Sequence, residues 1–381
     1  MAAGILVVGG GPAGYGAIAG ARQAGFTGEI VLVGREEDPP YDRPPLSKRF
    51  LLEDVERAKL YFPPAEADLR LGTAVAEIEP EAHRVRLEDG SVLEYEKLLL
   101  ALGSRARTLQ GFEDALTLRE MPDAVVLRDR LASGRPLDVV GAGFIGCEVA
   151  AAARAHDLQV TVWEALPQPL SRVLGDELGG RLADLHRANG VDLRTGVQEL
   201  PELSADAVVG VGSVPNQELA EAAGLDCDRG ILTDEFGRTS APDVYAAGDC
   251  SRFFSPVYGT HVRVEHFQTS QRQGRAVGKV LAGDEEPFRE VHWFWTDQYD
   301  LNLQYLGAGL PWDELVVRGR LEDPSFTAFL LASGQIVGAV GWNDGRTITQ
   351  VRRLLEREVD VSLEQLTDPG TDLRALARQA D

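Results

Sequence analysis

Two short apolar runs, each leading into a glycine-rich turn, are the clearest feature of the hydrophobic pattern. The first run, Ile5–Val8, enters the turn Gly9–Gly14, after which small and apolar residues recur at helical spacing as far as Gly25. A second apolar stretch at Glu29–Val33 has the length and composition of a strand. This succession of strand, turn, helix and strand predicts an α/β fold.

The same pattern begins again in the middle of the chain. Asp138–Val140 enters the turn Gly141–Gly146, an alanine-rich helix runs to about His156, and Gln159–Trp163 is the next expected strand. The repetition predicts two Rossmann-like nucleotide-binding units. Further strands are expected at Ala74–Ile78, Arg84–Leu87, Ser91–Leu93, Lys97–Ala101 and Ala207–Val211, and further helices at Asp176–Asn189 and Glu265–Leu281.

The pattern changes after Gly283. Aromatic residues cluster at Trp293–Trp295, and alternating strands follow as far as about Gly341. A charged helix is expected at Ile348–Glu358. We therefore expect a separate C-terminal α+β domain after the two nucleotide-binding units.

Length and charge narrow the possible functions. The 381 residues are too many for one ordinary core and predict two or three domains. A net charge of −22 argues against nucleic acid as a partner, because an acidic surface repels the phosphate backbone. No apolar stretch is long enough to cross a membrane, and Met1–Gly4 leads into a strand without a targeting signal, so we expect a cytoplasmic protein.

The cysteines argue against several kinds of site. Cys147, Cys227 and Cys250 lie far apart and form no CxxC or CxxxxC pair. A disulfide framework, a zinc ribbon and an active-site dithiol are therefore not expected. No metal site is predicted.

Both glycine-rich turns have the spacing GxGxxG of a dinucleotide-binding loop. The first glycine makes the tight turn, the second lets the backbone approach a pyrophosphate, and the third lets the helix pack close to the strand. These glycines are Gly9, Gly11 and Gly14 in the first turn, and Gly141, Gly143 and Gly146 in the second. An acidic residue ends the following strand in each unit, Glu36 and Glu164, which favours dinucleotide loops over ordinary glycine turns.

Two carboxylates have candidate roles at these loops. Glu164 can accept hydrogen bonds from the ribose hydroxyls of a dinucleotide and would repel a 2′-phosphate, which favours NADH over NADPH. A solvated surface acid is the alternative for Glu164. Asp249, in a turn after Gly248, can bind a sugar or ribityl hydroxyl, or it can be the N-cap of a helix.

Four segments of the chain resemble the bacterial ferredoxin reductases of the putidaredoxin reductase and dioxygenase-reductase type. They are YDRPPLSK at Tyr41–Lys48, GAGFIGCE at Gly141–Glu148, SAPDVYAAGDC at Ser240–Cys250 and FWTDQYDLNLQ at Phe294–Gln304. The resemblance implies a fold of the glutathione reductase type. Its FAD-binding domain is expected at residues 1–109 and 229–288, its NAD-binding domain at 110–228, and its C-terminal interface domain at 289–381.

The resemblance also implies an activity. Non-covalently bound FAD would take a hydride from NADH and pass single electrons to a 2Fe–2S ferredoxin, of Rieske or adrenodoxin type, in an oxygenase system. The enzyme would be a monomer or a homodimer. An NADH oxidase or peroxidase is one alternative, and a redox-controlled interaction protein resembling apoptosis-inducing factor is another.

The motifs and the resemblance together predict a set of cofactor-binding residues. They are Gly9, Gly11, Pro12, Ala13, Gly14, Arg35, Glu36, Arg43, Lys48, Val75, Ala101, Gly103, Arg107, Arg119, Gly248, Asp249, His266, Trp295, Gly141, Gly143, Phe144, Ile145, Gly146, Glu148, Glu164 and Gly212. For His266 a purely structural role is the alternative. The glycine loop at Gly9 is expected to hold FAD, and the loop at Gly141 to hold NADH.

Lys48 and Glu148 are the predicted catalytic residues. The resemblance suggests that they form an ion pair beside flavin N5, where the lysine charge would tune the flavin. The alternative is a glutamate in the first turn of a helix and an exposed lysine.

The acidic chain would need a local basic surface to bind an acidic ferredoxin. Arg346, Arg352, Arg353 and Arg357 are the candidates, and a solvated helix face is the alternative. One departure from the relatives is a segment at Val197–Ser204 that is shorter than their β-hairpin, a change that should spare the nucleotide loop.

Overall fold

A computed structural model describes residues 3–204 and 206–378 of the chain. The chain divides into two compact units. Unit 1 contains Met1–Asp42, Glu56–Arg105 and Val214–His292, and unit 2 contains Arg43–Val55, Ala106–Ser213 and Trp293–Asp381. Residues 1–2, where the predicted FAD-binding domain begins, and 379–381, where the predicted C-terminal domain ends, lie outside the described residues. The boundaries of three domains stay a prediction.

The main sheet of unit 1 is built around the apolar strand β1. Its parallel strands are β3 (Asp68–Leu71), β2 (Ile30–Gly34), β1 (Ala3–Val8), β6 (Val92–Leu100) and β14 (Val244–Ala246), in that order. Both faces of β1 are buried, since Leu6 and Val8 belong to one hydrophobic cluster and Ile5 and Val7 to another. A strand covered on both sides has no polar face, which is why this segment is a continuous apolar run.

Strand β6 joins two segments that the hydrophobic pattern had separated. Ser91–Leu93 and Lys97–Ala101 are expected as two strands, but a single strand covers Val92–Leu100. Its first half pairs antiparallel with β5 (Arg84–Leu87), which pairs with β4 (Val75–Glu79), and its second half lies between β1 and β14. The polar residues between the two segments alternate with the buried Tyr95, so the strand continues through them.

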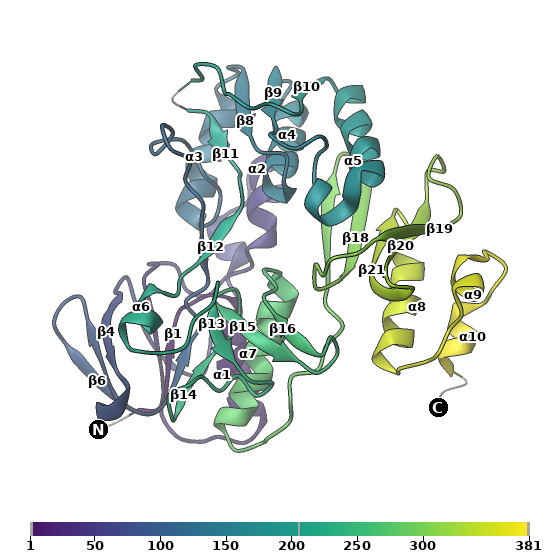
Figure 1. The fold of residues 1–381 in the computed structure, drawn as a ribbon. Coiled ribbons are helices and arrows are strands. Elements are labelled where there is room, and N and C mark those ends of the chain that lie inside the picture. Colours follow the sequence, from purple (N-terminus) through teal and green to yellow (C-terminus); the bar gives the residue numbers. More distant parts are fainter. Residues whose placement is uncertain (1–2, 205, 379–381) are drawn as a thin grey trace. The chain divides into compact units, whose positions relative to one another are not determined.

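Two helices of unit 1 approach each other closely. In α1 (Pro12–Gln23) a Cβ on Gly20 would lie 2.0 Å from the carbonyl oxygen of Arg275, and in α7 (Phe267–Leu281) a Cβ on Gly274 would lie 2.0 Å from that of Ala13. Only glycine permits this spacing, and the two helices lie side by side (Figure 1). The rest of unit 1 contains η2 (Arg57–Leu60), η3 (Pro80–Ala82), α6 (Glu218–Ala222), β13 (Ile231–Thr233), β15 (Ser251–Ser255) and β16 (Thr260–Val262).

Unit 2 repeats the nucleotide-binding pattern on a smaller sheet. Its parallel strands are β10 (Val191–Arg194), β9 (Val160–Trp163), β8 (Leu137–Val140) and β11 (Val208–Val209), in that order. The helices of this part are η1 (Pro44–Ser47), α2 (Arg49–Leu52), α3 (Met121–Ala132), α4 (Phe144–Ala155) and α5 (Ser171–Ala188). Strands β7 (Ser104–Ala106) and β12 (Ser213–Pro215) each contain one of the points at which the chain passes from one unit to the other.

Helix α5 begins five residues earlier than Asp176, where the hydrophobic pattern starts it. Its first turn is set off by a kink at Gly175, whose φ of 74° interrupts the helix. A Cβ at this glycine would lie 2.5 Å from the ring of Trp312, so the indole packs into the kink. The start predicted at Asp176 therefore lies at the kink, and the helix itself begins at Ser171.

The C-terminal part of unit 2 is an antiparallel sheet followed by helices. The strand order is β17 (Trp293–Gln298), β18 (Leu301–Gly307), β21 (Gln335–Trp342), β20 (Phe326–Ala332) and β19 (Glu314–Arg318), and the helices are α8 (Gly345–Glu356), α9 (Leu363–Thr367) and α10 (Leu373–Arg378). This agrees with the predicted α+β character. Tyr299 and Asp300 form a two-residue turn between β17 and β18, with Tyr299 in the left-handed region at φ 56°.

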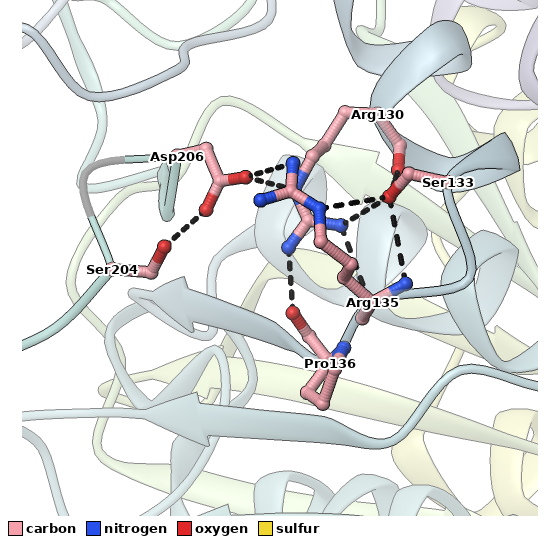
Figure 2. A network of polar contacts seen from close by, with 6 residues as sticks. All are labelled: Arg130, Ser133, Arg135, Pro136, Ser204 and Asp206. Atoms are coloured by element: carbon pink, nitrogen blue, oxygen red, sulfur yellow. Dashed lines mark hydrogen bonds and ion pairs between the residues drawn. The ribbon is translucent and has the colours of Figure 1, made fainter.

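A network of charges holds the end of the short Val197–Ser204 segment. Asp206 binds Arg130 Nε at 2.7 Å and Arg135 Nη2 at 2.5 Å, and it accepts a hydrogen bond from the Ser204 hydroxyl (Figure 2). Arg130 also donates to the carbonyl oxygen of Pro136 at 2.6 Å. The network therefore ties Asp206, just before β11, to the end of α3 and to the loop that connects α3 with β8.

Candidate functional site

The first glycine loop leaves the N-terminus of α1 open for an anion. Gly9 has a φ of +119°, and a Cβ on Gly14 would lie 2.0 Å from the Gly9 carbonyl oxygen, so both positions require glycine. Gly11 is the N-cap of α1 and Pro12 follows it, so no side chain caps the helix. The uncapped N–H groups and the positive end of the helix dipole fit the pyrophosphate of a dinucleotide.

Asp249 lies in a turn next to this loop. A Cβ on Gly248 would meet that of Ala13 at 2.8 Å, which brings the turn against the start of α1. The buried carboxylate of Asp249 accepts hydrogen bonds from the hydroxyls of Ser270 at 2.6 Å and Ser104 at 3.3 Å. The N-cap alternative for Asp249 is wrong, because strand β15 and not a helix follows the turn.

His266 is the N-cap residue of α7, although no side-chain cap is formed. Burial lowers the pKa of its imidazole to about 4, against an opposing effect of the Asp249 charge. The ring is therefore neutral at physiological pH. The cofactor role of His266 stays a prediction, with a structural role as the alternative.

The other predicted FAD contacts of unit 1 follow strands of the main sheet. Glu36 lies two residues after β2, and its carboxylate accepts a 2.5 Å hydrogen bond from the hydroxyl of Tyr41. Arg35 is exposed beside it. The remaining residues are Val75 at the start of β4, Ala101 directly after β6 and Gly103, with a φ of +66°.

The second glycine loop has the same construction in unit 2. Gly141 has a φ of +95°, a Cβ on Gly146 would lie 1.9 Å from the Gly141 carbonyl oxygen, and Gly143 is the uncapped N-cap of α4. Phe144 and Ile145 form the first turn of this helix. The loop therefore fits a second dinucleotide by the same physical criteria.

Glu164 is not a solvated surface acid, so that alternative is wrong. Its side chain is buried, and one oxygen accepts a 2.6 Å hydrogen bond from the N–H of Ala142 inside the loop. The other oxygen accepts a 2.8 Å hydrogen bond from the N–H of Leu166. The carboxylate is thus fixed at the loop, and each oxygen still has a lone pair for a ribose hydroxyl.

Lys48 and Glu148 form an ion pair, as the resemblance suggests. Lys48 Nζ lies 2.7 Å from Glu148 Oε1, with 20% of the lysine side chain and 4% of the glutamate side chain exposed. Thr296 donates a 2.6 Å hydrogen bond to the same oxygen, and Ser47 donates to Oε2. The alternative of an exposed lysine and an ordinary helix-start glutamate is wrong.

The predicted arginines of unit 2 have different environments. Arg43 donates a 3.0 Å hydrogen bond to the carbonyl oxygen of Arg119, so these two lie together. Arg107 is exposed, and its backbone N–H donates to the carbonyl oxygen of Gly212 at 2.9 Å. Trp295 stacks on Trp293 with ring centroids 5.3 Å apart.

The cysteines offer no redox pair among the described residues, in which all three are free thiols. Cys147 and Cys250 are buried, and burial raises the pKa of both. Burial also raises the pKa of Cys227 to about 11. Neutral buried thiols are poor nucleophiles and behave as small apolar side chains.

Three residues at these sites were not predicted. Ser47 and Thr296 both bind Glu148, and a Cβ on Gly210 would lie 3.2 Å from the N–H nitrogen of Gly146. Ser47 and Thr296 stand in the segments YDRPPLSK and FWTDQYD, next to residues that were singled out. Gly210 directly follows β11, within the strand expected at Ala207–Val211, and the hydrophobic pattern gives no sign of its contact with the glycine loop.

Comparison with known proteins identifies the family of the chain. The model of the pyridine nucleotide-disulphide oxidoreductase family matches residues 3–274, and the reductase C-terminal model matches residues 293–377. Rhodocoxin reductase of Rhodococcus erythropolis is 37% identical over 406 residues, covering 99% of this chain and 95% of that protein. The ferredoxin–NAD+ reductase component of the anthranilate 1,2-dioxygenase system of Burkholderia cepacia is 40% identical over 375 residues, covering 91% and 92%.

A solved structure of a related reductase matches this chain over nearly its whole length. The crystal structure of the covalent putidaredoxin reductase–putidaredoxin complex matches with a TM-score of 0.93 and 32% identity, over 99% of both chains. Within residues 3–204 and 206–378, no helix combines the length and the apolar character needed to cross a membrane. The predicted fold class, two nucleotide-binding domains and a C-terminal domain, is confirmed.

Proposed function

We propose that this chain, which belongs to the pyridine nucleotide-disulphide oxidoreductase family, is the NADH:ferredoxin reductase of an oxygenase system. Its cofactors are FAD and NADH. The observation that carries the proposal is a pair of uncapped glycine-loop helices combined with the Lys48–Glu148 ion pair, whose glutamate is buried. The similarity to the ferredoxin–NAD+ reductase component of the anthranilate 1,2-dioxygenase system supports it.

Each nucleotide has its own loop in this proposal. The backbone N–H groups at the start of α1 bind the FAD pyrophosphate, and Asp249 accepts a hydrogen bond from the ribityl chain. The N–H groups at the start of α4 bind the NADH pyrophosphate. Glu164 accepts hydrogen bonds from the adenosine ribose and repels a 2′-phosphate, so NADPH should be the poorer substrate, and equal catalytic efficiency with both nucleotides would contradict this role.

Bound FAD supplies the change from hydride transfer to single-electron transfer, which an iron–sulfur acceptor requires. Lys48 contributes a fixed positive charge at the ring, which stabilises negative charge that develops there. Glu148 holds the ammonium group in place through the 2.7 Å contact. Arg107 and Arg119 would bind the diphosphate of FAD, Arg43 would line the flavin together with Lys48, and Trp295 would shield the ring.

Electrons leave to an external protein in this proposal. Disulfide reductases pass electrons to a cysteine pair, and the described residues contain only free, separate thiols. The proposed acceptor is a 2Fe–2S ferredoxin, of Rieske or adrenodoxin type. We place the enzyme in the cytoplasm as a monomer or a homodimer.

A spectroscopic experiment tests the proposal. The purified protein is expected to be yellow, to bleach with NADH in the absence of air, and then to reduce a 2Fe–2S ferredoxin much faster than it reduces oxygen. Faster reduction of oxygen or peroxide would identify an oxidase or peroxidase instead. A protein that stays colourless after FAD is added would overturn the proposal.

A further inference from the structure

A row of polar side chains connects Glu148 to His186 of α5 and to Tyr299 within unit 2. Thr296 Oγ1 lies 2.6 Å from Glu148 Oε1, and Gln298 Nε2 lies 3.2 Å from Thr296 Oγ1. His186 Nε2 lies 2.9 Å from Gln298 Oε1, and the Tyr299 hydroxyl lies 3.1 Å from His186 Nδ1. Glu148, Thr296, Gln298 and His186 are all buried, so water does not replace these bonds.

The charge of Glu148 sets the direction of every bond in the row. A carboxylate only accepts, so the Thr296 hydroxyl donates to it and accepts from the Gln298 amide N–H. The amide oxygen of Gln298 then faces His186 and accepts from its Nε2–H. His186 Nδ1 carries no proton and accepts from the Tyr299 hydroxyl, so four donors in succession point toward Glu148.

The last donor is held in an unusual backbone conformation. Tyr299 has a φ of 56° in the turn between β17 and β18, a region that bulky side chains rarely adopt. The turn directs the phenol against the His186 ring, with centroids 5.3 Å apart at 72°. A two-residue hairpin turn requires a positive φ at this position, and the same turn brings the hydroxyl of Tyr299 within hydrogen-bond distance of Nδ1.

We infer that Thr296, Gln298, His186 and Tyr299 are positioning residues that act as one chain on Glu148, and through Glu148 fix the ammonium group of Lys48. The inference rests on the proposed function, because Lys48 tunes electron transfer only in a flavin reductase. It also assigns a purpose to the segment FWTDQYD, whose threonine, glutamine and tyrosine supply three of the four donors.

The protonation state of His186 is consistent with this row of hydrogen bonds. Burial lowers the pKa of the imidazole to about 4, although the hydrogen bond with Gln298 opposes the shift. The ring therefore remains neutral at physiological pH, with one nitrogen donating and one accepting. Burial raises the pKa of Tyr299, so its hydroxyl keeps its proton.

The first experiment determines the direction of the hydrogen bonds in the row, by nitrogen NMR of the histidine rings in the holoenzyme. The His186 signals are identified by their absence in H186Q. The wild type is expected to show the Nε2–H tautomer. T296V removes the hydroxyl that accepts from the Gln298 amide, so this amide is free to flip and present its N–H to His186. We therefore expect His186 to shift toward the Nδ1–H tautomer in T296V. T296S keeps the hydroxyl and should give the wild-type signals.

Thr296 does not touch His186, so an effect at that distance requires the chain. Unchanged His186 signals in T296V would overturn the inference. Y299F provides a second variant at the opposite end, and it should move only the Nδ1 signal toward the value of a nitrogen without a donor. An unchanged Nδ1 signal in Y299F would also overturn the inference.

The second experiment measures the consequence for Lys48. T296V is expected to slow the anaerobic reduction of bound FAD by NADH about tenfold, with an unchanged Kd for NADH, while T296S stays within about twofold of the wild type. A wild-type rate in T296V would contradict the inference and leave the proposed function intact. Absence of FAD reduction in the wild type would instead defeat the proposed function, while the NMR experiment would still test the chain.

Discussion

Glu148 shows at the residue scale how one side chain acquires a defined role from its neighbours. Its two oxygens accept bonds from the adjacent residues Ser47 and Lys48 and from the distant Thr296, so the donors come from two separate segments of the chain. Each donor compensates part of the cost of burying the carboxylate. A single missing donor should therefore affect both stability and chemistry.

Lys48→Met tests this pair directly. The variant leaves Glu148 buried without its counter-charge, so we expect the free energy of unfolding to fall by about 2–3 kcal/mol, less than for a fully buried pair because Lys48 is partly exposed. The rate of flavin reduction by NADH should fall, or the flavin potential should shift. Lys59→Met, at an exposed lysine, is the control and should change neither quantity. An unchanged rate and an unchanged potential in the Lys48 variant would show that Lys48 takes no part in the mechanism.

The sequence allowed some of these residues to be predicted and not others. Lys48 and Glu148 could be paired only through the resemblance, because they lie 100 positions apart. Ser47 and Thr296 carry common side chains that have many uses, and only the folded arrangement shows that both donate to Glu148. The N-cap alternative for Asp249 failed because the turn leads into a strand, which the polar residues after it did not reveal.

At the element scale, the N-termini of α1 and α4 depend on glycines that have no substitute. Gly14→Ala would place a Cβ 2.0 Å from the Gly9 carbonyl oxygen, so the loop would have to open. We expect this variant to lose bound FAD, measured as the flavin-to-protein absorbance ratio. Gly10→Ala, whose Cβ would meet only Leu32 at 3.7 Å, should keep it. Full FAD content in the Gly14 variant would contradict the loop assignment.

The network at Asp206 predicts a pH dependence. The Ser204 hydroxyl, and after it the charges of Arg130 and Arg135, lower the pKa of Asp206. Because the pKa is lower in the folded protein, this stabilisation is complete above the unfolded value of about 3.9 and is lost as the pH falls through the folded value. Asp206→Asn should reduce the free energy of unfolding by about 1 kcal/mol at neutral pH.

The difference between Asp206→Asn and the wild type should shrink as the pH falls below about 4, in urea unfolding at a series of pH values. Asp176→Asn, at an exposed position of α5, is the control for removal of one carboxylate. A difference that does not change with pH would contradict the assignment of the stabilisation to the Asp206 charge.

The elements themselves were largely predictable, since the apolar runs and glycine turns mark β1, α1, β8 and α4 clearly. The misjudged boundaries have physical causes. Strand β6 continues through polar residues because its outward side chains do not need burial, and α5 includes a turn before the kink at Gly175, against which the distant Trp312 packs. Contacts from distant segments decide such boundaries, and local patterns do not contain them.

At the scale of the whole molecule, the net charge of −22 makes the basic residues of α8 significant for an acidic partner. Of the four predicted arginines, Arg352 pairs with Glu356 at 2.7 Å, and Arg357 donates to the carbonyl oxygen of Ala377. Arg346 and Arg353 are exposed and lie seven residues apart, on the same face of the helix.

The double variant R346E/R353E should therefore lower the rate of ferredoxin reduction about tenfold at low ionic strength, and less at high salt. The step from NADH to flavin should be unaffected. R172E/R187E, which makes the same change of charge at exposed positions of α5, is the control. Equal effects of the two double variants would indicate a response to net charge alone and would reject α8 as the docking surface.

The electron count tests the central claim most directly. NADH is added in small portions to the holoenzyme with an excess of oxidised 2Fe–2S ferredoxin in the absence of air, and the reduced ferredoxin is measured by its absorbance. A reductase that splits each hydride into single electrons reduces two ferredoxin molecules for each NADH oxidised. NADH oxidation that leaves the ferredoxin oxidised would contradict the assignment.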